Sequence, residues 1–89
     1  MHFKQFIKNH LTAAQFDRLP TLMNITPTRC TRMLNEPKRM SAQEIISIIK
    51  IINTPEISPE YLITEFNCGT RVLTVESSKT LIENWVFPV

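Results

Sequence analysis

Residues 19–52 constrain the fold most, because they carry the start and stop signals of three short helices in succession. The clearest break lies at 23–29. There Asn24 can adopt the left-handed conformation that ends a helix, Thr26 can cap the next helix, and Pro27 falls in the first turn, where proline is tolerated. The pattern predicts two helices joined by a tight turn, followed by an apolar third helix.

The helix predicted at 27–35 is amphipathic. Cys30, Met33 and Leu34 are spaced three and four residues apart, so they share a face that can pack inward. The polar residues left pointing outward are Thr28, Arg29, Thr31, Arg32 and Asn35. Arginine can fork onto guanine, asparagine can pair with adenine, and threonine can contact a phosphate or a thymine methyl group. Polar outer faces are the rule on globular helices, so a solvated surface is the alternative, but the capped turn favours base contacts.

This succession of residues resembles the phage-repressor and Cro-like helix-turn-helix family, the lambda-repressor-like or Xre-type DNA-binding proteins. The resemblance covers 3–66 and is strongest at 19–33, where the apolar anchors follow the family's spacing without a gap. Those anchors are Leu19, Met23, Ile25, Cys30 and Met33. The resemblance implies a mainly α fold, with a compact five-helix helix-turn-helix bundle at 1–68. Beyond Gly69 the resemblance fades, and the residues themselves predict a short C-terminal strand and helix tail at 69–89.

The resemblance and the chemistry of the outward face together predict which residues contact double-stranded DNA. Bases are expected to be read by Thr28, Arg29, Arg32 and Asn35, and phosphates to be bound by Thr26, Lys38, Arg39 and Ser41. Two departures from the family pattern stand out. Asn24 replaces the usual turn glycine, which is acceptable because asparagine tolerates positive φ. Phe16 stands where many members have a polar phosphate-binding residue, and Pro20 either kinks or restarts the second helix.

The charges of the chain are unevenly distributed. Residues 1–50 hold eight Lys or Arg against three acidic residues, a net charge of +5, whereas residues 51–89 hold two against five, a net charge of −3. The basic half contains the helix expected to contact DNA. Such polarity would orient the molecule on a phosphate backbone and predicts steeply salt-dependent binding, with chance clustering in a short chain as the alternative.

Further helices are predicted on either side of this region. Capping boxes at 12–15 and 41–44 each open a helix, and Ser58 caps a fifth helix that is expected to end near the sole glycine, Gly69. The helix after the second box carries six isoleucines within 45–52. These exceed one helix face, so this helix is expected to be the central core element, with cover by the tail or by another subunit as the alternatives.

An apolar tail follows Gly69. Residues 71–75 are expected to form a strand and 77–86 a short helix. The large apolar residues of the tail are Val72, Leu73, Val75, Leu81, Ile82, Trp85, Val86 and Phe87. Each contributes about 1.5 to 3 kcal/mol on burial, so the tail has to pack on something. It either folds back over the isoleucine-rich helix or pairs strands between subunits. We expect a homodimer, because two reading helices one DNA turn apart strengthen a weak half-site contact.

The expected function is sequence-specific binding of double-stranded DNA by a small, repressor-like transcriptional regulator that reads the major groove with the helix 27–35. The alternative is a protein-interaction module, such as the antitoxin of a toxin–antitoxin pair, that holds a protein partner through the C-terminal tail. An enzyme is not expected, because the chain has no glycine-rich phosphate loop, clustered carboxylates or Ser-His-Asp spacing, and no cofactor is implied.

Composition also argues against metal, disulfide and membrane classes. The 43% hydrophobic fraction is ample for one domain without disulfides or a metal. Cys30, Cys68, His2 and His10 are too widely spaced for a zinc site, so the cysteines are expected to be buried thiols. The sequence has no run of about 18 apolar residues, so no membrane span is predicted. The N-terminus lacks the apolar stretch of a secretory signal. We therefore expect a cytoplasmic protein without membrane contact.

Overall fold

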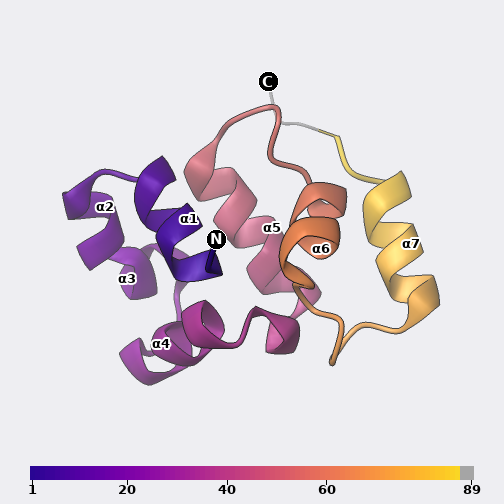
Figure 1. Cartoon of the computed structure of the whole chain (residues 1–89), viewed down its shortest axis with the longest axis horizontal. Coiled ribbons are helices and arrows are strands. Elements are labelled where there is room, and N and C mark those ends of the chain that lie inside the picture. Colours follow the sequence, from indigo (N-terminus) through magenta and orange to yellow (C-terminus); the bar gives the residue numbers. More distant parts are fainter. Residues whose placement is uncertain (87–89) are drawn as a thin grey trace.

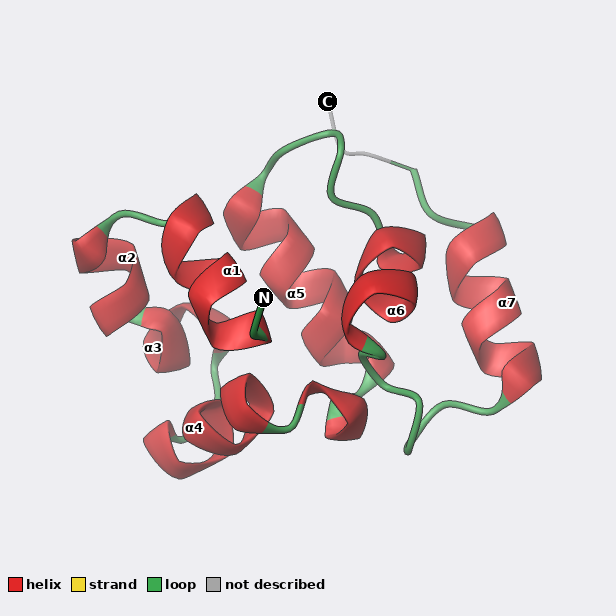
Figure 2. Cartoon of the chain, in the orientation of Figure 1, coloured by secondary structure: helices red, strands yellow, loops and turns green. Residues whose placement is uncertain are grey.

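Helices dominate the computed structural model, which describes residues 1–86 (Figure 1). The elements are α1 (Phe3–His10), α2 (Ala13–Asp17), α3 (Leu19–Met23), α4 (Pro27–Asn35), a short 3₁₀ helix η1 (Pro37–Arg39), α5 (Ala42–Ile52), α6 (Pro59–Phe66) and α7 (Val75–Glu83). The described part of the chain contains no strand (Figure 2). The mainly α class is therefore confirmed. None of these helices is long and apolar enough to cross a membrane.

Local capping signals set most helix boundaries where the sequence predicts them. The capping boxes that begin with Thr12 and Ser41 are both formed, and the Ser58 side chain accepts a hydrogen bond from the Tyr61 amide at 3.2 Å. Asn24 ends α3 in the left-handed conformation, at φ 57°. The residue that ends α6 is Asn67, also at φ 57°, two residues before the predicted glycine stop. Asparagine tolerates this conformation better than most residues.

The region around Pro20 restarts as a new helix. Arg18 separates α2 from α3, at φ −98° and ψ 7°, and Pro20 lies in the first turn of α3. Proline has no amide hydrogen to donate to the preceding turn, so a first-turn position is the one it occupies without losing a helical hydrogen bond. The Leu22 amide donates to the Arg18 carbonyl at 2.9 Å, which starts the new helix. The sequence allowed either a kinked helix or a new helix at Pro20, and the structure has a new helix.

α5 is the central element of the core. Figure 1 shows it between the α1–α3 side of the molecule and α6. Four of its six isoleucines, Ile45, Ile48, Ile49 and Ile52, are buried, and the other two are half-buried. The rest of the buried apolar set is Phe3, Phe6, Ile7, Leu19, Met23, Cys30, Met33, Leu34, Met40, Ile57, Leu62 and Cys68. Elements before and after α5 thus close over it from both sides, which agrees with the prediction of a central core helix.

The C-terminal tail differs from its prediction. The strand expected at 71–75 is absent, because the Val72 and Leu73 amides donate to the Gly69 carbonyl in a turn instead of pairing with another strand. Thr74 then caps α7, which begins at Val75. An isolated strand has no partner for its backbone groups, whereas a turn and a capped helix satisfy them locally.

α7 lies beside α6 of its own chain (Figure 1). Three large apolar side chains of the tail, Leu73, Leu81 and Trp85, pack partly buried against the core. Val72 and Val75 stay 53% and 90% exposed. Phe87, which the sequence places among the apolar tail residues, lies outside the described residues. The described part of the tail therefore folds back in part and leaves Val72 and Val75 in solvent.

Candidate nucleic-acid interface

The outward face of α4 is a continuous polar stripe. Thr28, Thr31, Arg32 and Asn35, here called the outward stripe, are all exposed and lie at positions i, i+3, i+4 and i+7. Residues with this spacing share one face of a helix. The opposite face is buried, with Cys30, Met33 and Leu34 in the core. Three of the four residues expected to read bases, Thr28, Arg32 and Asn35, therefore lie together on a solvent-facing surface.

Arg29, the fourth expected base reader, does not point outward. Its Nε donates to Glu44 Oε2 at 2.8 Å, and its Nη2 donates to Glu44 Oε1 at 2.5 Å and to the Arg39 carbonyl at 2.9 Å. The expectation of an outward Arg29 is wrong in this respect. The physical reason is the buried Glu44 carboxylate at the start of α5, which needs a donor and faces the first turn of α4. Arg29 joins α4 to α5 and η1.

The Glu44 end of the Arg29–Glu44 pair is shielded from solvent, and the Arg29 end is partly exposed. The side chain of Glu44 is 9% exposed and that of Arg29 is 35% exposed. The hydrogen bonds from Arg29 hold the pKa of the Glu44 carboxyl below its usual value, helped by the Ser41 amide and opposed by burial. The hydrogen bond to Glu44 likewise raises the pKa of Arg29. Glu44 thus serves the capping box of α5 and the orientation of α4 at the same time.

This pair predicts a pH dependence of stability. The folded-state pKa of Glu44 lies below its ordinary value of 4.5, so the stabilisation is complete above that value and is lost as the pH falls through the lowered pKa. We expect the free energy of unfolding to drop when the pH is lowered from about 5 to about 3, and Glu44→Gln to show a flatter profile. Urea denaturation across this range measures the effect. Glu56→Gln, which removes an exposed carboxylate, is the control, and equal profiles for the two variants would contradict the prediction.

The residues expected to bind phosphates border the stripe. The hydroxyl oxygens of Thr26 and Ser41 accept hydrogen bonds from the amides of Arg29 and Glu44, each at 3.1 Å, as caps of α4 and α5. A hydroxyl that accepts in this way keeps its own hydrogen to donate, so both remain able to bond a phosphate. Lys38 and Arg39 are exposed on η1.

Sequence reasoning missed one basic residue of this surface, Arg71. Residues 69–71, here called the strap, follow α6 and are tied to η1 by two hydrogen bonds, from the Gly69 amide to the Pro37 carbonyl and from the Arg71 amide to the Lys38 carbonyl, both at 2.9 Å. The sequence groups Arg71 with the acidic half of the chain, and no local signal connects it to η1. The structure brings it beside the basic residues of α4 and η1.

The strap helps to enclose a hollow of about 410 Å³ on this surface. Its lining residues are Arg29, Arg32, Arg39, Ser41, Arg71 and Val72. Four guanidinium groups therefore border one concavity, and one of them, that of Arg29, is neutralised by Glu44. Arg39 also lies 3.6 Å from Glu36, but both side chains are more than half exposed, so this pair is weak.

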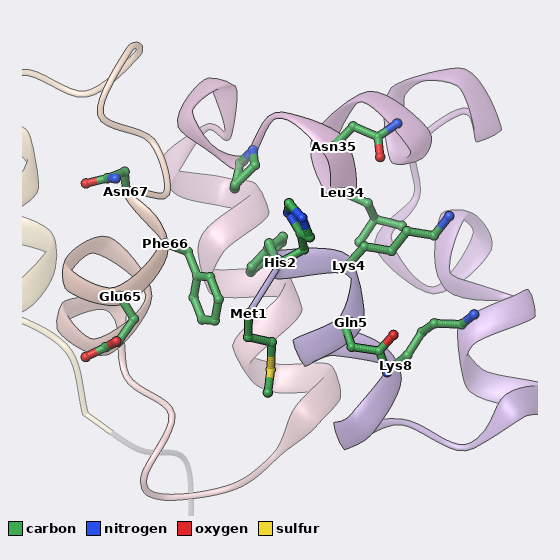
Figure 3. A pocket seen from close by; sticks show the side chains of 12 residues that line it. Met1, His2, Lys4, Gln5, Lys8, Leu34, Asn35, Glu65, Phe66 and Asn67 are labelled. Atoms are coloured by element: carbon green, nitrogen blue, oxygen red, sulfur yellow. The ribbon is translucent and has the colours of Figure 1, made fainter.

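The far end of the stripe meets a second, larger groove. Asn35 borders an open groove of about 740 Å³ between α1, the end of α4 and α6. Figure 3 shows Asn35 on the same side of this groove as Lys4 and Lys8 of α1, and Glu65 on the opposite side. The basic surface therefore continues past α4 onto α1.

Metal chemistry finds no support in residues 1–86, where no three His, Cys, Asp or Glu side chains gather closely enough to hold a metal ion. Cys30 and Cys68 are both buried free thiols, as predicted. Burial raises the pKa of Cys68 to about 12.

Comparison with protein-family models, with curated proteins and with solved structures finds no match to this chain.

Proposed function

We propose that this protein binds double-stranded DNA sequence-specifically, with α4 in the major groove, and acts as a small transcriptional regulator. The observation that carries the proposal is the outward stripe, because a helix fits the major groove and these side-chain types match base edges. If α2 and α3 are counted as one helix interrupted at Arg18, then α1 to α6 give the five helices that the lambda-repressor-like resemblance implies.

The proposal gives a role to each of the residues that the sequence predicts to contact DNA. Arg32 forks onto a guanine and Asn35 pairs with an adenine, while Thr28 contacts a base edge or a thymine methyl group. Lys38 and Arg39 bind phosphates, together with the hydroxyl groups of the two cap residues. Arg29 positions α4 through Glu44 and does not itself contact a base.

A dimer is part of the same proposal. One helix reads only a few base pairs, and a second copy one DNA turn away multiplies the affinity of a weak half-site. Val72 and Val75 of the tail remain exposed and offer apolar area for such a contact. The same valines would also suit a different protein chain, which keeps the antitoxin-like interaction module as the second candidate.

The function is tested by selecting, from a pool of random duplexes, those that the purified protein binds. The selected sequence is then used in competition binding experiments with wild type and Arg32→Ala. We expect a short inverted repeat with half-sites about 10 base pairs apart. Arg32→Ala is expected to lose preference at one base position of each half-site, at a cost of about 1 to 3 kcal/mol in binding to the preferred sequence. Lys38→Ala is expected to weaken binding to all sequences alike.

Lys50→Ala provides the matched control, because Lys50 is exposed near the far end of α5 and its removal changes the net charge equally. Recovery of a single half-site would refute the dimer but would still support base contacts by α4. Enrichment of no motif, or an Arg32→Ala variant that keeps the wild-type preference, would refute sequence reading by α4 and favour the interaction module.

A further inference from the structure

The strap holds Arg71 in a defined place. Its two hydrogen bonds to η1 use backbone atoms only, so the Arg71 side chain takes no part in them and remains exposed. The turn is fixed further by the Val72 and Leu73 amides, which donate to the Gly69 carbonyl at 3.0 and 2.7 Å. Gly69 itself is buried against α5 and η1. Arg71 is therefore presented from a fixed backbone and not from a free tail.

The hollow beside the strap has an excess of positive charge. Within residues 1–86, neither Arg32 nor Arg71 has an ion-pair partner, and Arg39 has only the loose contact with Glu36. Like charges that border one concavity repel one another, and this repulsion is relieved when an anion enters. Arg71 also borders a second hollow of about 230 Å³, whose charged lining residues are Lys38, Arg39 and Arg71 against Glu36.

The chemistry of the lining selects phosphate. Guanidinium groups donate paired hydrogen bonds whose geometry matches the oxygens of a phosphate, and the Ser41 hydroxyl adds a further donor. The hollow adjoins Arg32 of the outward stripe, on the side of α4 that faces η1. A phosphate placed there would belong to the backbone that flanks the groove occupied by α4.

We propose that the hollow bordered by Arg32 is a phosphate-binding site, in which Arg39, Ser41 and Arg71 bind the phosphate and Arg32 keeps the base contact proposed above. The strap supplies one of the donors, Arg71. The identification of the ligand as a backbone phosphate of duplex DNA rests on the function proposed above. The strap thus extends the DNA-contacting surface beyond the helix-turn-helix region into the C-terminal part of the chain.

The salt dependence of duplex binding tests the site. In wild type the logarithm of the binding constant falls linearly with the logarithm of salt concentration, and each phosphate contact contributes about 0.9 to the slope. Arg71→Ala is expected to make the slope shallower by about 0.9, Arg71→Lys to keep it, and Lys50→Ala to leave it unchanged. The backbone hydrogen bonds of the strap survive these substitutions, and thermal unfolding of each variant verifies the fold.

A second arm separates the site from the proposed function. Inorganic phosphate is titrated into ¹⁵N-labelled protein at constant ionic strength, with chloride as the reference. Shifts of the Ser41 and Arg71 amides in wild type, absent in Arg71→Ala, are expected. Duplex binding with equal slopes in wild type and Arg71→Ala would overturn the site and leave the proposed function standing. Failure of the wild type to bind any duplex would overturn the proposed function. In that case, amide shifts on addition of phosphate would assign the hollow to a free phosphate group. Absence of those shifts would overturn the site as well.

Discussion

Replacing Arg29 by methionine is expected to lower the free energy of unfolding by about 3 kcal/mol and to weaken binding to all DNA sequences alike. The substitution leaves the Glu44 carboxylate, whose side chain is 9% exposed, without its charged donor. It also removes the donor to the Arg39 carbonyl. Breaking one side of a buried ion pair costs about 3 to 5 kcal/mol, and the partial exposure of Arg29 places this pair at the lower end. Urea denaturation at neutral pH measures the loss.

The double variant Arg29→Met with Glu44→Gln is the control for this prediction. With the carboxylate gone, no buried charge remains unpaired, so the double variant is expected to be more stable than Arg29→Met alone. Binding data add a second criterion. A stable Arg29→Met variant that loses preference at a single base position would contradict the positioning role and restore Arg29 as a base reader.

The sequence predicts those parts of this fold that local chemistry decides. The caps at Thr12, Ser41 and Ser58 act on amides three residues away, and Asn24 ends α3 through its own backbone conformation. Such interactions are complete within one turn of the chain, so the residue pattern contains both partners. The same holds for the amphipathic spacing of α4, which separates its buried and exposed faces correctly except at Arg29.

The remaining features depend on partners far apart in the chain. Arg29 lies on the outward side by helical spacing, but Glu44 of a different helix reaches it, and only tertiary packing brings the two together. The strand expected at 71–75 fails for a related reason. A short apolar run forms a strand only where a partner strand exists, and here the amides of the strap bond to η1. Arg71 joins the basic surface through that long-range contact.

Gly69→Ala is expected to lower the free energy of unfolding by about 2 to 4 kcal/mol and to displace the strap. Gly69 has φ +75°, a conformation that costs an L residue about 1 to 2 kcal/mol. An added Cβ would also lie 2.9 Å from Leu73 Cδ1, 3.0 Å from Ile45 Cδ1 and 3.1 Å from the Met40 carbonyl oxygen. The leucine end can move aside, but the Met40 carbonyl belongs to the backbone next to the cap of α5, so the strap has to give way.

Asn67→Ala isolates the backbone part of this cost. Asn67 has φ 57° and is exposed, so alanine there carries the conformational strain without crowding from α5 or η1. Chemical denaturation is expected to show a larger loss for Gly69→Ala than for Asn67→Ala. Because a displaced strap withdraws Arg71 from the hollow, Gly69→Ala should also reduce the salt slope of duplex binding as Arg71→Ala does, while Asn67→Ala keeps the wild-type slope. Equal losses of stability in the two variants would show that η1 and α5 accommodate the methyl group. An unchanged salt slope in a destabilised Gly69→Ala variant would show that the position of Arg71 does not depend on the close approach of Gly69 to Met40.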